Sequence, residues 1–169
     1  MLYANGADHA GTFLYKVLLQ ETPESVHTSL HLAAMHGDKF SIRSLSLLGH
    51  DINQRDNEAK TPTHHAAVNG RLEVVEFLVK EAGADVESKD SKYGMTPLSR
   101  TAYNGQLEAV KFLVEQAGAD VASKDNWDQT ALDLARLGLK YSWKEQRCRA
   151  VAAWLESRIT TYEADNRYH

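Results

Sequence analysis

The sequence predicts an all-α solenoid, a stack of about four helix-turn-helix repeats with atypical segments at both ends. A ten-residue segment that begins at Thr28 returns at Thr61 and Thr96, 33 and 35 residues later, and a weaker copy begins at Thr130, 34 residues further on. Each of the two middle copies leads into an apolar segment and then into Ala-Gly-Ala-Asp-Val. A fixed period in this range is typical of helical units that bury their apolar faces only against one another.

The first 27 residues are predicted to form an N-terminal capping segment. Residues 12–19 have the composition of a degenerate helix that covers the open face of the first repeat. A terminal unit of a solenoid must be modified in this way, because it has a neighbour on one side only.

The first helix of each middle repeat is delimited by its own residues. Thr61 and Thr96 are suited to the N-cap position, and each is followed by a Pro, which loses nothing at the first helical position. Gly70 and Gly105 end these helices, because a residue without a Cβ accepts the left-handed turn. Each first helix is therefore expected to be short.

The second helix of each middle repeat has an apolar stripe that is expected to be core. Gly83 and Gly118 end these two helices, and a polar loop leads from each into the next repeat. The stripe consists of Leu72, Val75 and Leu78 in one repeat and of Leu107, Val110 and Leu113 in the other.

The fourth repeat begins at Thr130 and loses the pattern after Gly138. Its second helix is predicted over residues 143–159, with an inward face made of Cys148, Val151 and Trp154 or Leu155. The repeat array is thus expected to cover residues 28–158, and residues 159–169 form a polar C-terminal tail that is expected to fray.

These motifs resemble those of the ankyrin-repeat family. The segments Thr61-Pro-Thr-His-His-Ala-Ala-Val-Asn-Gly70 and Thr96-Pro-Leu-Ser-Arg-Thr-Ala-Tyr-Asn-Gly105 follow the Thr-Pro-Leu-His-x-Ala opening of that family. The style of the loops is similar to that of ankyrin arrays common in fungal proteins. The resemblance implies a protein-protein interaction module or scaffold.

Composition favours one elongated domain without nucleic-acid or membrane partners. The chain has 169 residues, with 19 Lys and Arg against 23 Asp and Glu, a net charge of −4, and no basic run. It lacks a secretory signal and any apolar run long enough to span a membrane, and its single cysteine rules out an internal disulfide. We therefore expect a cytoplasmic or nuclear protein.

Candidate metal and catalytic residues all have structural interpretations. His31 and His64 occupy the His position of the repeat motif, where the ring is expected to bond nearby backbone, and no zinc-ligand spacing accompanies them or His65. Asp133 takes the same position in the fourth repeat and is interpreted as a helix-start residue, and Cys148 as a small buried side chain. We predict no metal, no cofactor and no enzymatic activity.

The resemblance implies that partners are held by the loop tips and by exposed positions of the first helices, which line a concave face. Carried onto this sequence, these positions are Arg55, Asn57, Glu58, Lys60, Val68, Lys89, Lys92, Tyr93, Met95, Arg100, Tyr103, Asn126, Trp127 and Gln129.

Aromatic residues distinguish this set from an average surface. Tyr93 and Trp127 lie between polar residues on loop tips, and Tyr103 lies on a first helix without a core role, so all three are predicted interface anchors. The alternative for Trp127 is that it folds back over the end of the array. The third loop is one residue longer than the second. Either this loop and Arg100 form a site for an acidic group of a partner, or the sequence of the third repeat has drifted without a functional reason.

Two other functions remain open from the sequence. The concave groove would serve a small-molecule-binding protein or enzyme if His, Asp and Arg side chains converged there as acid-base groups. Alternatively, the chain is a fragment of a larger receptor that associates only with itself.

Overall fold

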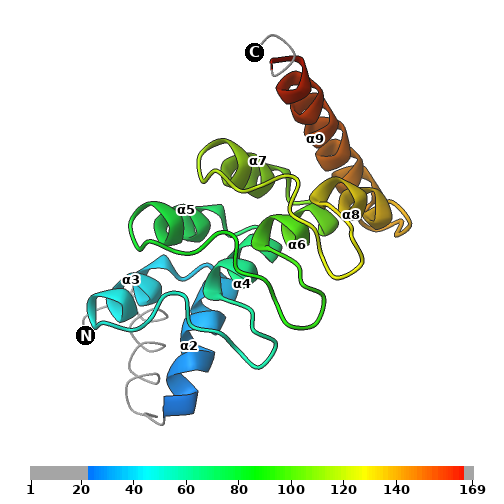
Figure 1. Ribbon diagram of the computed structural model, residues 1–169. Helices are drawn as coiled ribbons and strands as arrows, with labels where there is room; N and C mark the ends of the chain where they lie inside the picture. Colours follow the sequence, from blue (N-terminus) through cyan, green and yellow to red (C-terminus); the bar gives the residue numbers. More distant parts are fainter. Residues whose placement is uncertain (1–22, 166–169) are drawn as a thin grey trace, which may run out of the picture.

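The computed structural model describes the backbone of residues 23–165 and the side chains of residues 29–161. The predicted capping helix at residues 12–19 lies outside this part. The described chain is all-helical, which confirms the predicted fold class (Figure 1). Its helices are α2 (Pro23–His36), α3 (Lys39–Leu47), α4 (Pro62–Val68), α5 (Leu72–Lys80), α6 (Pro97–Tyr103), α7 (Leu107–Glu115), α8 (Ala131–Gly138) and α9 (Glu145–Asp165). None of these described helices is both long and apolar enough to cross a membrane.

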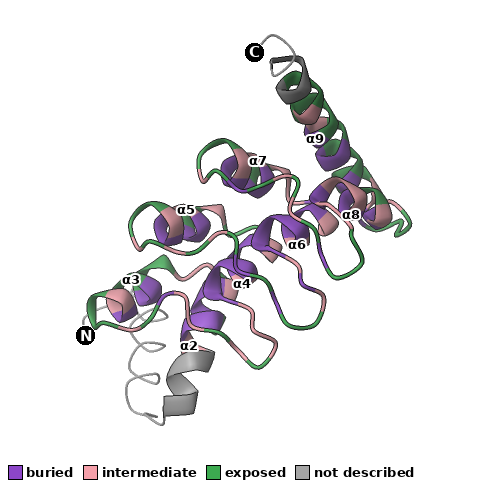
Figure 2. Cartoon of the chain, in the orientation of Figure 1, coloured by how far each residue is buried: buried purple, intermediate pink, exposed green. Residues whose placement is uncertain are grey.

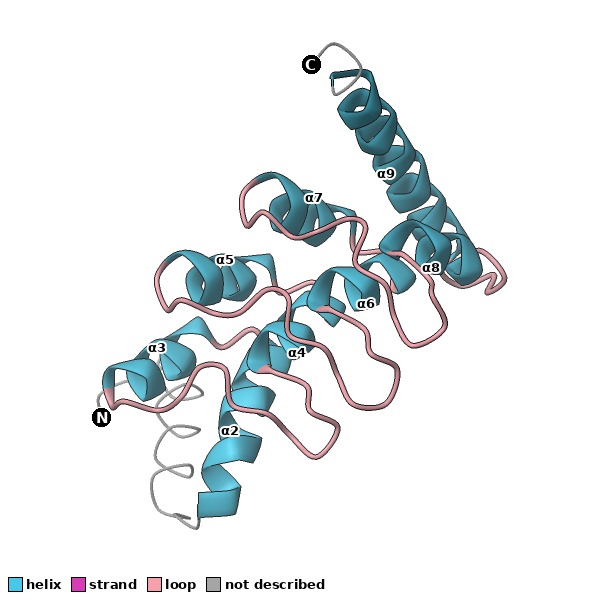
Figure 3. Ribbon diagram, in the orientation of Figure 1, coloured by secondary structure: helices cyan, strands magenta, loops and turns pink. Residues whose placement is uncertain are grey.

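The helices form two rows. The first helices α2, α4, α6 and α8 pack in sequence, and the second helices α3, α5 and α7 form a parallel row beside them. The loops between repeats project past the first row (Figure 3). Helix α9 packs on α7 and α8 at the end of the stack.

Small side chains allow the first helices to stack closely. Ala33, Ala66, Thr101 and Ala135 occupy equivalent positions in the four repeats, and all are fully buried. The Thr101 hydroxyl donates to the carbonyl of Pro97 in its own helix, so burying it leaves no unpaired polar group.

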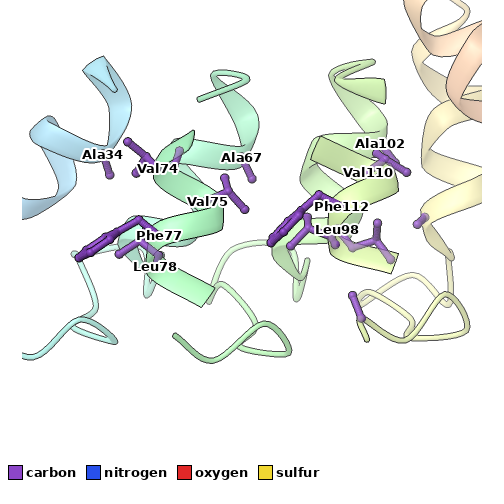
Figure 4. Packing of buried hydrophobic residues seen from close by; sticks show 14 of the residues in the cluster. Ala34, Ala67, Val74, Val75, Phe77, Leu78, Leu98, Ala102, Val110 and Phe112 are labelled. Atoms are coloured by element: carbon purple, nitrogen blue, oxygen red, sulfur yellow. The ribbon is translucent and has the colours of Figure 1, made fainter. Parts of the chain in front are cut away.

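Buried residues lie in both rows of helices (Figure 2), and most of the larger core side chains belong to the second helices (Figure 4). The predicted stripe is confirmed at Val75, Leu78, Val110 and Leu113, which have no exposed surface, whereas Leu72 and Leu107 are half-buried at the edge. The core is wider than the three-residue spacing predicted, because these helices pack on two sides. The additional buried side chains are Val74, Phe77, Ala109 and Phe112.

The predicted helix signals are confirmed in the middle repeats. The Thr96 hydroxyl accepts a hydrogen bond from the N–H of Ser99 at 3.2 Å. Gly105 has φ 71°, and a Cβ there would lie 2.6 Å from the Cβ of Arg147, so both its backbone angle and the approach of α9 require glycine.

The ends of the array differ from the prediction in two places. Helix α2 begins at Pro23, directly after Thr22, and passes through Thr28, which is followed by Ser29 and not by a Pro that would disfavour a helical conformation there. Helix α9 continues to Asp165 instead of ending near residue 159. It contains neither Gly nor Pro, and the hydroxyls of Thr160 and Thr161 donate to carbonyls four residues earlier.

Candidate partner-binding site

An aspartate at the start of each loop tip fixes the local backbone. In the third repeat, an oxygen of Asp90 accepts the N–H groups of Lys92 at 3.1 Å and Tyr93 at 2.7 Å. In the fourth, an oxygen of Asp125 accepts those of Trp127 and Gln129, both at 2.9 Å. A short side chain with two acceptor oxygens is well suited to such turns.

Hydrogen bonds between adjacent tips set their register. The N–H of Ser91 donates to the carbonyl of Glu58 at 2.9 Å, and the N–H of Asn126 donates to that of Tyr93 at 3.0 Å. Glu58, Tyr93 and Trp127 each precede a residue with positive φ, so they occupy the same position in successive tips. Tyr93 is therefore level with Trp127, and the extra residue of the third loop lies between Asp90 and Tyr93.

The two aromatic rings at this position are in contact. Their centroids lie 5.6 Å apart at an interplanar angle of 40°. Trp127 is 58% exposed, so it does not fold back into the end of the array.

A pocket of about 460 Å³ between the third and fourth repeats is lined in part by this aromatic pair. Six of the predicted partner-binding residues meet there: Tyr93, Met95, Arg100, Tyr103, Trp127 and Gln129. Leu134 and Leu137 of α8 complete the lining. The structure thus brings together, from two loops and two helices, residues that the sequence separates by up to 44 positions.

Arg100 lines this pocket and contacts both Asp90 and Tyr93. Its Nε donates to the second oxygen of Asp90 at 2.8 Å, and its guanidinium lies 5.4 Å from the centre of the Tyr93 ring. Burial opposes ionisation of Asp90, but the bond from Arg100 and the N–H of Tyr93 outweigh it and lower the pKa of that carboxyl. The charge of Arg100 is therefore balanced by Asp90, while its Nη2 is buried and makes no hydrogen bond among the described residues.

The histidines make the hydrogen bonds that the repeat motif predicts. Nε2 of His31 lies 3.1 Å from the carbonyls of Gln54 and Lys60. Nδ1 of His64 accepts from the N–H of Thr61 at 3.1 Å, so Nε2 carries the proton and donates to the carbonyl of Met95, also at 3.1 Å. Among the residues that the structure describes, no three His, Cys, Asp or Glu side chains form a group that could hold a metal ion.

The two other candidate chemical residues have structural contacts as well. An oxygen of Asp133 accepts from the N–H and the hydroxyl of Thr130, as a helix-start residue does. Cys148 is fully buried and its thiol donates to the carbonyl of Tyr103 at 3.4 Å, while burial raises the pKa of the thiol.

The remaining predicted partner-binding residues lie outside the pocket, along the loop tips and on α4. Several of them connect neighbouring loops: Arg55 donates to the carbonyl of Lys89, and Lys89 donates to that of Lys124. Lys60 pairs with Glu58, and Lys92 covers the Tyr93 ring at 5.1 Å. Asn126 supports Tyr93 through its backbone, Asn57 is exposed at its tip, and Val68 is half-buried at the end of α4.

Sequence reasoning missed the turn between α8 and α9. Tyr141 and Trp143 are exposed there, beside a buried Lys144. Two aromatic residues within a short polar stretch, after the repeat pattern has ended, were the available signal.

Comparison with known proteins identifies the repeat family. The family model described as ankyrin repeats (3 copies) matches residues 5–90 and 30–125. Similar segments occur in a Candida albicans palmitoyltransferase, AKR1 (36% identity over 77 residues, 46% of this chain and 9% of that protein), and in mouse synphilin-1 (39% over 71 residues, 41% and 7%). A further match is a putative glutaminase, glutaminase 2, of Caenorhabditis elegans (38% identity over 63 residues, 37% of this chain and 10% of that protein).

The chain spans a tenth or less of each of these relatives, so their names describe proteins that are mostly outside the match. Ankyrin repeats generally mediate protein-protein interaction, and the fold is typically non-enzymatic. The family match covers well over half of the chain and agrees with the two rows of helices, the loop tips and the histidine bonds. The chain belongs to the ankyrin-repeat family.

Proposed function

We propose that this chain is a protein-binding module whose partner docks on the loop tips and first helices of the third and fourth repeats. The observation that carries the proposal is the pocket in which Tyr93, Tyr103 and Trp127 converge. Aromatic side chains on a rigid scaffold bury a large area on binding and lose little conformational entropy.

The pocket favours binding over catalysis. Arg100 lines it, but neither His64 nor His65 does, and Arg100 is already bonded to Asp90. His65 lies 2.8 Å from an oxygen of Asp56, in the second repeat. The two histidines that the enzyme alternative invokes thus make structural bonds outside the pocket, and Arg100 inside it is paired with a carboxylate.

Affinity capture from cell extract tests the proposal. The wild-type chain is compared with a variant carrying Tyr93→Ala and Trp127→Ala, and with Phe40→Ala as a control. Phe40 on α3 is as exposed as Trp127, at 58%, but lies at the other end of the array. We expect the double variant to lose partners that the control retains. Equal capture by all three would contradict the proposal, and light scattering shows whether a captured partner is a second copy of this chain.

A further inference from the structure

The aromatic surface of the pocket continues beyond the repeats, onto the turn between α8 and α9. Tyr141 is 45% exposed and Trp143 is 68% exposed. The Tyr141 ring lies 6.2 Å from that of Tyr103, which forms one wall of the pocket. Large exposed aromatics that adjoin a pocket are typical of interaction surfaces.

Lys144 holds this turn in place from below. It is only 2% exposed, and its Nζ donates to the carbonyl of Tyr103 at 2.8 Å. The same Nζ lies 3.2 Å from the centre of the Tyr103 ring, 4.9 Å from that of Tyr141 and 5.3 Å from that of Trp143. Cation-π contacts with three rings fix the aromatics before any partner arrives, so little conformational entropy is lost on binding.

Several of the described cationic side chains around this surface have no carboxylate partner. Lys92, Lys140 and Arg147 make no ion pair within the part of the chain that the structure describes. Lys92 covers Tyr93, Arg147 lies 5.8 Å from the Trp143 ring, and Lys140 lines a shallow depression that shares Gln129 and Leu137 with the pocket.

Two of the carboxylates at the same surface form ion pairs, and two bond to neutral groups. Asp90 pairs with Arg100, and Asp128 pairs with Lys124 at 3.4 Å. Asp125 and Asp133 bond to the neutral groups of their own loop and helix start. Although the chain has a net charge of −4, the described cations without an ion pair at this surface, Lys92, Lys140 and Arg147, outnumber the described carboxylates without one, Asp125 and Asp133. Such a surface complements negative charge on a partner.

We propose that the docking surface extends from the pocket over Tyr141 and Trp143, and that its occupant is a protein segment with large apolar side chains flanked by carboxylates. This inference rests on the proposed function and names the chemistry of the partner. A peptide is favoured over single-stranded nucleic acid, which also binds aromatic and cationic side chains, because Met95, Leu134 and Leu137 make the pocket apolar.

Selection from a library of displayed random peptides tests the chemistry. The purified full chain is the target, and enriched peptides are synthesised and titrated by fluorescence anisotropy. We expect enrichment of aromatic or leucine residues next to Asp or Glu. Enrichment of basic peptides, absence of acidic sequences among the enriched peptides, or tighter binding of a labelled single-stranded oligonucleotide would overturn the proposal.

Variants of the turn test the extent of the surface. We expect Trp143→Ala to raise the Kd of the selected peptide by about tenfold. The double variant with Lys140→Glu and Arg147→Glu should raise it by about the same factor. Phe40→Ala and Arg43→Glu, exposed on α3, are the matched controls and should bind as the wild type does. The melting temperatures should stay unchanged, because these side chains are exposed.

The outcomes separate this inference from the proposed function. If Tyr93→Ala and Trp127→Ala abolish peptide binding while Trp143→Ala does not, the pocket binds and its extension over the turn is wrong. If none of the aromatic variants changes binding, the proposed function itself fails.

Discussion

At the scale of single residues, one position of the first helix decides how each loop tip is held. His65 bonds to Asp56 in the second repeat and Arg100 bonds to Asp90 in the third. In the fourth repeat the corresponding residue is Leu134, and the second oxygen of Asp125 is buried without a partner. Leu134 therefore adds apolar surface to the pocket lining, but it cannot bond to the loop aspartate as His65 and Arg100 do.

Asp90 is therefore expected to matter more to stability than Asp125. Asp90→Ala should lower the free energy of unfolding by about 3 kcal/mol, because it leaves Arg100 unpaired as well as removing backbone bonds. Asp125→Ala, the matched control, removes backbone bonds only and should lower it by about 1–2 kcal/mol. Chemical denaturation measures both.

The difference in stability between the Asp90→Ala and Asp125→Ala variants should disappear in acid. The pKa of Asp90 is lowered in the folded state, so its stabilisation is present above the unfolded pKa of about 3.9 and is lost as the pH falls below that value. Equal losses for the two variants at neutral pH would show that the Arg100 bond contributes nothing.

His64 should make the protein sensitive to mild acid. Desolvation lowers the pKa of His64 from 6.5 to about 4, so the unfolded chain binds a proton in this interval that the folded chain does not. The stabilisation is present above pH 6.5 and is lost as the pH falls towards 4, by up to about 3 kcal/mol. Urea titrations across this range should give a shallower pH dependence for His64→Gln, and an unchanged slope would contradict the assignment.

At the scale of helices, the sequence predicted the middle repeats better than the ends. Thr, Pro and Gly signals mark both boundaries of α4 and α6, and these local rules operate without tertiary contacts. The start of α2 carries the same signal, Thr22 followed by Pro23, which sequence reasoning overlooked because the repeat period pointed to Thr28. The end of α9 carries no such signal, and there the hydroxyls of Thr160 and Thr161 bond to carbonyls four residues earlier.

The second helices carry the most easily tested part of the fold. Leu78→Ala and Leu113→Ala should each lower the free energy of unfolding by about 2–5 kcal/mol, because both side chains are fully buried and leave a cavity. Leu47→Ala on α3, where the side chain is 81% exposed, is the control and should be nearly neutral. Near-neutral effects at the two buried positions would mean that the repeats are misaligned.

At the scale of the whole molecule, the stacking of repeats places equivalent residues of successive repeats side by side on one surface. The candidate site could be predicted as a set of loop and helix positions, because the period places Tyr93 and Trp127 in adjacent tips. The sequence could not predict the pocket itself, since Leu134 and Leu137, which complete its lining, look like ordinary core residues.

The most direct test of this account measures affinity and stability together in the tip variants. For a partner obtained by capture, Trp127→Ala and Tyr93→Ala should each weaken binding by about 2 kcal/mol, roughly a 30-fold rise in Kd, because the anchors lose their buried area. Their melting temperatures should stay close to that of the wild type, because the two rings line the pocket and neither belongs to the buried core. A fall of many degrees in melting temperature with affinity intact would instead make these residues part of the core and contradict the account.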